Sequence, residues 1–469
     1  MSFTTESSRW PDVWLAATAR GTTICGDFLA ATALALALQG SGAGGLAVSG
    51  LLLAATLPLV VLAPLTGRLA DRVDSRTLLV TVGLAQAVIC TLLAVAEHPV
   101  LVVGLVALLA CGLAVTQPCL AALLPAMVRP ADLPRASAIS QNAVSLGALG
   151  GPVLAGLLVG QFGTRVPLLL DAVTYLALVV AGLLLRTRRG GRRPATATAT
   201  VAAGPAGGGS PANQANPSGT DVGWRLRRDP LMLVMVASTA VVIAAIGGIN
   251  VIEVFFIRET LEGSATTYGL VGAAWMAGML PGSWIAARLA RRFDHDGALI
   301  RGVLVTLAMC SLLVLLAATV PTAGLLVPLW LVAGAANGGE NVFANLLTSR
   351  RVPEAMRGRA YASYGAAVQG GSMAGYLIGG ALLAVVPPRP LIAAAGAAGV
   401  VVVLAFVPVV ARAVRRPVPD EAHRHPQAAG TDAGLATSGR PAEPEPEAGD
   451  TVGSWLSASH ARGSGTSSS

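Results

Sequence analysis

Apolar runs of about 20 residues, the length that spans a bilayer's hydrocarbon layer, recur along the whole chain. Short segments rich in Gly, Pro or charged residues separate them. Only 12% of the residues are charged, against about 25% in an average soluble domain, and 54% are hydrophobic. A water-soluble core cannot absorb this much apolar surface. The sequence therefore predicts a protein that crosses a lipid bilayer many times.

Twelve such runs can be counted, and none alternates between apolar and polar residues. Continuous apolarity without a period of two favours helices over strands. We therefore expect an all-α membrane protein with twelve transmembrane helices. The predicted spans are 13–38, 47–66, 77–96, 99–126, 137–161, 166–185, 231–257, 267–287, 298–320, 322–347, 360–386 and 390–411.

Arginine is distributed unevenly between the two sides of the predicted membrane. The loops after spans two, four, eight and ten contain thirteen Arg, and the loops after odd-numbered spans contain three. Cytoplasmic loops carry the excess of positive charge in membrane proteins. Both termini are therefore predicted to be cytoplasmic, with the protein in the cell membrane. The net charge of +8 follows from this asymmetry and does not indicate a nucleic acid partner.

Two segments have a composition that cannot form a core. Residues 186–229 and 413–469 are rich in Gly, Pro, Ala, Thr and Ser, which predicts disorder. The expected domains are a six-helix bundle over 1–185, a cytoplasmic linker over 186–229, a second six-helix bundle over 230–412 and a cytoplasmic tail over 413–469.

The two predicted bundles repeat each other at an offset of 224 residues. "RASA" at 135–138 aligns with "RAYA" at 359–362, and three glycines align with three glycines further along. Parallel six-helix halves joined by a long loop are typical of transporters that bind substrate between the halves near the membrane midplane. The glycine pairs are Gly147 with Gly371, Gly151 with Gly375, and Gly156 with Gly380.

The turn between spans two and three, "GRLADRVDSR" at 67–76, is densely charged in an apolar chain. We call it the charged turn. It resembles the signature G-x-L-A-D-R-x-x-x-R of the major facilitator superfamily, which Gly67, Asp71, Arg72 and Arg76 meet. That family often has Gly where this sequence has Asp74. The resemblance covers residues 10 to 415 and implies the major facilitator fold, with two pseudo-symmetric six-helix bundles.

A second segment, "GALGGPVLAG" at 147–156, is similar to the antiporter motif G-x-x-x-G-P-x-x-G-G of the same superfamily. Gly147, Gly151, Pro152 and Gly156 match it, and Ala155 replaces one glycine. "GDFLAATALALAL", "PAMVRPADLPRASAIS" and "VPEAMRGRAYAS" look like the drug and siderophore antiporter branch that contains the macrolide and enterobactin exporters. This resemblance implies proton-coupled efflux. Glycines around one proline also predict a bent, closely packed hinge helix.

Asp71 is expected to act in a gating contact. A carboxylate at the cytoplasmic end of span two can face the start of span eleven, near Arg357 and Arg359, where helix dipole and guanidinium both favour negative charge. Such a contact forms only while the cytoplasmic ends are together. A plain solvated turn is the alternative.

Charged side chains inside the membrane are costly and mark substrate or proton paths. The candidates are Asp27, Asp171, Glu253 and Glu340, with a paired structural acid, such as Asp27 with Arg20, as the alternative. Amides accompany two of them at helical spacing, which predicts shared polar faces. The residues of the expected proton or substrate path are Asp27, Asp171, Asn250, Glu253, Asn337, Glu340 and Asn341, with Asn345 and the cavity residue Trp330 nearby.

No Walker loop, metal-ligand spacing or nucleophile motif appears, so neither an enzyme nor a cofactor or metal is expected. The five cysteines lie in apolar runs and are expected to be small buried side chains.

The expected function is proton-coupled export of small amphipathic molecules by a monomer in the lipid bilayer. The alternatives are a nutrient importer of the same fold and a transport-inactive membrane sensor or assembly partner.

Overall fold

The computed structural model describes residues 8–63, 65–66, 69, 73–187, 226, 229–293, 295–353 and 356–415. The described residues belong to one structural unit, Met1–Arg416. Regular secondary structure within these ranges is helical throughout, which confirms the all-α prediction. The two predicted disordered segments, 186–229 and 413–469, fall almost wholly outside the described residues.

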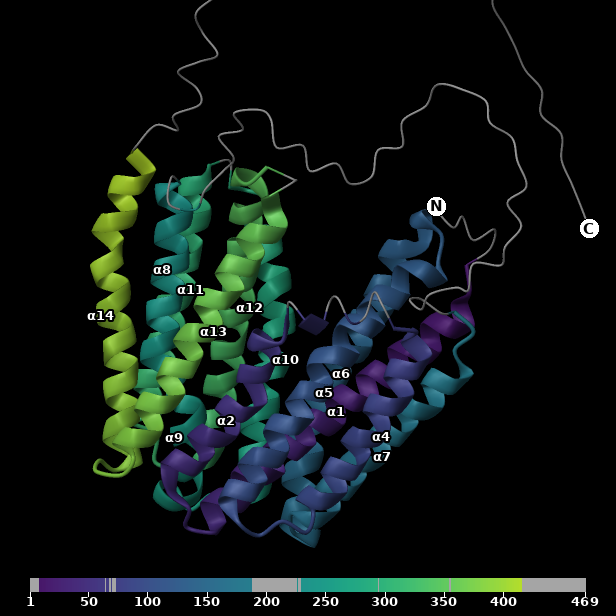
Figure 1. The fold of residues 1–469 in the computed structure, drawn as a ribbon. Helices are drawn as coiled ribbons and strands as arrows, with labels where there is room; N and C mark the ends of the chain where they lie inside the picture. The colour runs from purple at the N-terminus through teal and green to yellow at the C-terminus, as the bar shows by residue number, and fades with distance from the viewer. Residues whose placement is uncertain are drawn as a thin grey trace, which may run out of the picture. The chain divides into compact units, whose positions relative to one another are not determined.

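The helices of the first half pack side by side, with α1 against α6 and α7, and α4 against α5 and α7 (Figure 1). Proline occupies one of the first two positions of α1, α5 and α6, since proline suits the first helical turn. Asp74 caps α4 by accepting a hydrogen bond from the backbone N–H of Arg76. The helices are α1 (Trp10–Gly40), α2 (Gly44–Val61), α4 (Ser75–Leu93), α5 (Pro99–Met127), α6 (Leu133–Phe162) and α7 (Arg165–Leu184).

The second half contains the remaining long helices, with α11 against α12 and α14, and α8 against α13 and α14. Asp229 caps α8 through the N–H groups of Leu231 and Met232. The helices are α8 (Pro230–Gly247), α9 (Ile249–Phe255), α10 (Ala265–Ala290), α11 (Asp296–Ala317), α12 (Leu326–Arg351), α13 (Arg357–Leu382) and α14 (Pro388–Arg415), with a π-helical turn η3 (Phe256–Thr260) after α9.

Two boundaries differ from the prediction. The seventh span, expected as one helix over 231–257, breaks at Gly248 into α8 and α9. At this break α13 lies very close, because a Cβ atom at Gly248 would be 3.0 Å from the carbonyl oxygen of Gly375. The last helix continues to Arg415, past the expected end of the second bundle at 412.

Ten helical segments in the described ranges are long and apolar enough to cross a membrane. The other two predicted spans, α12 and α13, are long enough but less apolar. α12 carries a Glu, three Asn and two Arg, and seven of the 26 residues of α13 are Gly. Polar residues in a span normally face the protein interior or a water-filled cavity. The composition of α12 and α13 therefore indicates an inner position in the bundle.

The glycines aligned at the 224-residue offset occupy equivalent positions. In the first half, Gly147 and Gly151 face the backbone of α1 around Gly21 and Cys25. In the second half, Gly371 and Gly375 face the backbone of α8 in the same way, around Ala240 and Gly247. The missing side chains let each helix pair approach within backbone contact. The sequence repeat is therefore a repeat of helix packing.

The third glycine of each set contacts the other half. A Cβ atom at Gly156 would lie 2.8 Å from the carbonyl oxygen of Ala265 in α10, and one at Gly380 would lie 2.7 Å from that of Gly45 in α2. Figure 1 shows α2 beside α13 and α10 beside α6. These two related contacts join the halves.

Candidate functional site

Asp27 of α1 and Asp171 of α7 lie in one buried cluster. Asp171 is fully buried and accepts hydrogen bonds from the Thr174 hydroxyl at 3.0 Å and the Cys90 thiol at 3.2 Å. The Tyr175 hydroxyl donates to Asp27 at 2.5 Å. We call these five residues the N-half acid cluster.

Gly26 allows α1 to approach this cluster. A Cβ atom at Gly26 would collide with the side chains of Asp171 and Thr174. Gly26 directly precedes Asp27 in the sequence, but the sequence does not show that Gly26 lies against Asp171 and Thr174. Thr174 and Tyr175 could have been found by their helical spacing from Asp171, whereas Cys90 lies 81 residues away and gives no local signal.

The alternative of an Asp27–Arg20 ion pair is wrong. The Arg20 guanidinium instead contacts the Ser140 hydroxyl at 3.5 Å, and its Nε atom has no hydrogen-bond partner. Seven residues separate the two side chains, which is about 10.5 Å along a helix axis. That separation is too large for a direct ion pair between them.

Glu340 of α12 connects three helices of the second half. It is 2% exposed and accepts hydrogen bonds from the Tyr364 hydroxyl of α13 at 2.7 Å and the Thr239 hydroxyl of α8 at 3.4 Å. Gly338 and Gly339 beside it leave room for α10 and α11. Glu340 therefore lies in a satisfied, buried position rather than on an open path.

The asparagines of α12 form the expected stripe on a face that is partly exposed. Each amide donates to the backbone carbonyl one turn earlier, from Asn341 to Asn337 at 2.9 Å and from Asn345 to Asn341 at 2.8 Å. Their side-chain carbonyl oxygens stay available to other donors.

Glu253 of α9 lies apart from both of these groups. Its Oε1 atom is buried and has no hydrogen-bond partner. Trp330 and Tyr268 flank the carboxyl group, and the Asn250 amide, expected to share its face, donates to Gly247 instead. Trp330 is 4% exposed, so it supports Glu253 and does not line an open cavity.

Half of the charged turn, including Gly67, Asp71 and Arg72, lies outside the described residues. The expected partner Arg357 donates to the carbonyl oxygens of Ser349 at 2.9 Å and Val352 at 3.2 Å, and Arg359 is exposed. Arg357 therefore caps the end of α12. The contact between Asp71 and these arginines stays a prediction.

The antiporter-type motif has two separate packing roles. Gly147 and Gly151 pack inside the first half. Pro152 and Gly156 face α10, where a Cβ atom at Gly156 would lie 3.2 Å from the Cα atom of Gly269. The Thr266 hydroxyl also donates to the Gly156 carbonyl at 3.3 Å. The motif thus connects α1, its neighbour in the same half, with α10 in the other half.

An ion-pair network at the ends of α8, α11 and α12 was not predicted. Arg351 contacts Asp229 at 2.9 Å and Asp296 at 3.0 Å. Burial lowers the pKa of the Arg351 guanidinium, but the hydrogen bonds and charges of Asp229 and then Asp296 outweigh this effect and raise it overall. The network fixes three helix ends of the second half.

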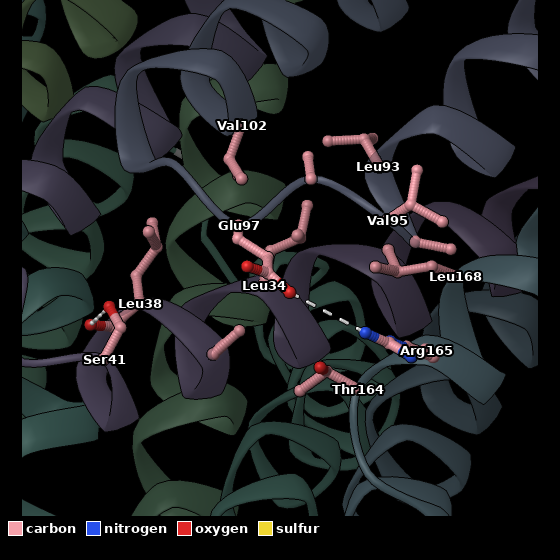
Figure 2. A pocket seen from close by; sticks show the side chains of 13 residues that line it. Leu34, Leu38, Ser41, Leu93, Val95, Glu97, Val102, Thr164, Arg165 and Leu168 are labelled. Atoms are coloured by element: carbon pink, nitrogen blue, oxygen red, sulfur yellow. Dashed lines mark hydrogen bonds and ion pairs between the residues drawn. The ribbon is translucent and has the colours of Figure 1, made fainter.

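A small cavity lies at the end of the first half where α1 ends and α7 begins (Figure 2). Its volume is about 210 Å³. Arg165 and Glu97 face each other across it at 3.8 Å, with side chains 71% and 88% exposed. We call it the end pocket. Its lining comes from α1, α4, the α4–α5 loop, α5 and the start of α7.

Two helical halves with a repeated glycine pattern and buried carboxylates define a transporter of the major facilitator type. The chain belongs to the family described as transmembrane secretion effector, whose model matches residues 7–431. A search of curated proteins found no match.

Solved structures share the fold at low sequence identity. A nucleoside transporter, NupG, superposes with a TM-score of 0.66 at 14% identity, over 85% of this chain and 99% of its own. A bacterial homologue of the iron transporter ferroportin in an inward-facing state superposes with a TM-score of 0.63 at 15% identity, over 87% of this chain and 100% of its own. A peptide transporter, POT, in complex with alafosfalin superposes with a TM-score of 0.65 at 12% identity, over 88% of this chain and 96% of its own. These similarities confirm the major facilitator fold.

Proposed function

We propose that this protein is a proton-coupled exporter of small amphipathic organic molecules that works by alternating access. It acts in the cell membrane as a monomer, with both termini in the cytoplasm. The description of its family as a secretion effector and the antiporter-type motif in α6 support export over import.

The observation that carries the proposal is the environment of Glu253. The Oε1 atom of Glu253 is buried without a hydrogen-bond partner, while the Trp330 side chain hydrogen-bonds the carboxyl group. A charged carboxylate that is only partly satisfied in a buried position is costly, and binding one proton removes the charge. α9, which carries Glu253, contributes Val251, Val254 and Phe255 to the hydrophobic core of the first half. Glu253 therefore lies where the halves meet. Separating them would expose it to water and change its protonation, which couples proton binding to the conformational cycle.

The contacts between the halves favour an inward-facing state. They involve Gly156 of α6 and Gly380 of α13, and the Gln39 amide also donates to Glu259 at 3.0 Å. All four residues lie near helix ends that the arginine asymmetry assigns to the outside. Substrate would then enter from the cytoplasm, past the asparagine stripe of α12.

The decisive experiment measures accumulation of candidate amphipathic substrates in cells with and without the gene, with and without an uncoupler. We expect expression to lower accumulation and the uncoupler to abolish the difference. Glu253→Gln should remove uphill export while leaving the amount of protein in the membrane unchanged. The matched control is Glu262→Gln, an exposed position that follows η3.

The alternatives give different results. Higher accumulation on expression would indicate an importer. No change for any substrate would favour a transport-inactive sensor. Full, uncoupler-sensitive export by Glu253→Gln would remove this residue as the proton carrier, and Asp27 would be tested next.

A further inference from the structure

The end pocket and the N-half acid cluster are both built from residues of α1, α4 and α7. Leu168 lines the pocket and lies three residues before Asp171, about 4.5 Å along the axis of α7. Leu93 lines it three residues after Cys90 on α4. Residues three or seven apart share a helix face.

The third helix shows the same relation. Leu34 lines the pocket seven residues after Asp27, about 10.5 Å along α1. Each of the three helices thus carries one residue of the acid cluster and one residue of the pocket on the same face. The two residues are one or two helical turns apart. The pocket therefore lies one to two helical turns beyond the cluster, and Asp171 is the nearest buried acidic group along these faces.

The size of the pocket selects between possible occupants. Pockets for drug-sized molecules have volumes of about 300–1,000 Å³. The 210 Å³ of this pocket is too small for such a molecule, but it holds several waters at about 30 Å³ each. Glu97 at its mouth gives it an exposed carboxylate that attracts protons from bulk water (Figure 2).

We propose that the end pocket is the proton entrance from the outer side, through which water delivers protons to Asp171 and then to Asp27. This inference rests on the proposed proton-coupled function. A hydronium ion in the pocket gives its proton to the Asp171 carboxylate and becomes water. Asp171 then passes that proton to Asp27 and returns to its charged form, so one proton moves inward and no other bond changes.

Asp27 completes the path because it is partly exposed, unlike Asp171. The proton can therefore leave the bundle from Asp27. This route runs inside one half, so it does not require the two halves to separate on the outer side. The titratable and charged groups that face it are Cys25 and Asp27 from α1, Cys90 from α4, Asp171 and Tyr175 from α7, and Glu97 and Arg165 at the mouth.

The test blocks the pocket after the protein has folded. Val95 lines the pocket and is 67% exposed, and Val100, on the same side of the first half but outside this pocket, is 73% exposed. Val95→Cys and Val100→Cys are purified, reconstituted in liposomes and labelled with an impermeant, bulky cationic thiol reagent. Proton uptake after an acid jump on the labelled side and substrate binding are measured before and after labelling.

Labelled Val95→Cys should take up protons about tenfold more slowly than the same unlabelled protein, a change of about 1.4 kcal/mol in the barrier. Its substrate affinity and the uptake by labelled Val100→Cys should not change. In an Asp171→Asn background, the label at position 95 should have no further effect. Unchanged uptake by labelled Val95→Cys would overturn the proposal, even when transport remains uncoupler-sensitive. Loss of uncoupler sensitivity in unlabelled wild type would instead refute the proposed function.

Discussion

Replacing Gly156 by Ala should drive the two halves apart at the contact between α6 and α10. The added Cβ atom would lie 2.8 Å from the Ala265 carbonyl oxygen and 3.0 Å from the Thr266 Cα atom. Ordinary contact begins at 3.4 Å, so α10 must move by about 0.6 Å. Both neighbours are backbone atoms that cannot rotate away. Overpacking of this kind costs about 1–3 kcal/mol.

That cost applies only to the state in which α6 and α10 are in contact. The ratio of separated to joined states should therefore rise by about 5- to 140-fold, since 1.4 kcal/mol is tenfold. Spin labels on the outer ends of α6 and α10 would report the change as a longer distance distribution. Gly160→Ala is the matched control, because its Cβ atom would lie 3.4 Å from the Thr266 hydroxyl. An unchanged distribution in Gly156→Ala, or an equal shift in Gly160→Ala, would refute the reasoning.

Three further predictions concern parts of the chain that the arginine asymmetry places on the cytoplasmic side. Asp71→Asn should lower the ratio of outward-facing to inward-facing protein by about 1.7- to 30-fold, as expected for loss of a helix-terminus interaction of about 0.3–2 kcal/mol. Asp74→Asn should have little effect, and equal effects of the two substitutions on spin-label distances would contradict a gating role. Arg351→Gln should lower the free energy of unfolding by about 1–3 kcal/mol, because the carboxylates of Asp229 and Asp296 lose a charged partner. Thermal unfolding in detergent would measure this loss, and an unchanged melting temperature would contradict it. Cysteines introduced at Ser210 and Ser459 should resist an impermeant thiol reagent in intact cells, and their labelling would reverse the orientation.

The helices could be predicted because apolarity and length follow directly from membrane thickness. The glycine repeat was equally informative, since Gly147 and Gly371 meet the same kind of backbone in each half. The break at Gly248 was missed, because the prediction followed the length of the apolar run and gave no weight to the adjacent glycines Gly247 and Gly248. α13 packs closely against the chain at these glycines.

The four intramembrane acids of the candidate site could be found from the sequence, but the side chains that hydrogen-bond them could not. Glu340 is satisfied by Thr239 and Tyr364, which lie 101 and 24 residues away. Periodicity finds neighbours within a helix, as between Asp171 and Thr174, but does not show which helices adjoin. This is why the acids were expected on shared polar paths, whereas the structure separates Glu253 from Glu340.

The low apolarity of α12 and α13 has a consequence for how the chain enters the membrane during synthesis. Charged residues near the centre of a helix disfavour its insertion by about 2.5–3.5 kcal/mol each, and Glu340 lies near the middle of α12. α12 should therefore insert poorly alone and depend on α10 and α11, which emerge from the ribosome first and pack against it. Tyr364 arrives later, with α13. Until then Glu340 lacks one of its two hydrogen-bond donors, so a nascent chain that pauses between α12 and α13 holds an intramembrane carboxylate that is only partly satisfied.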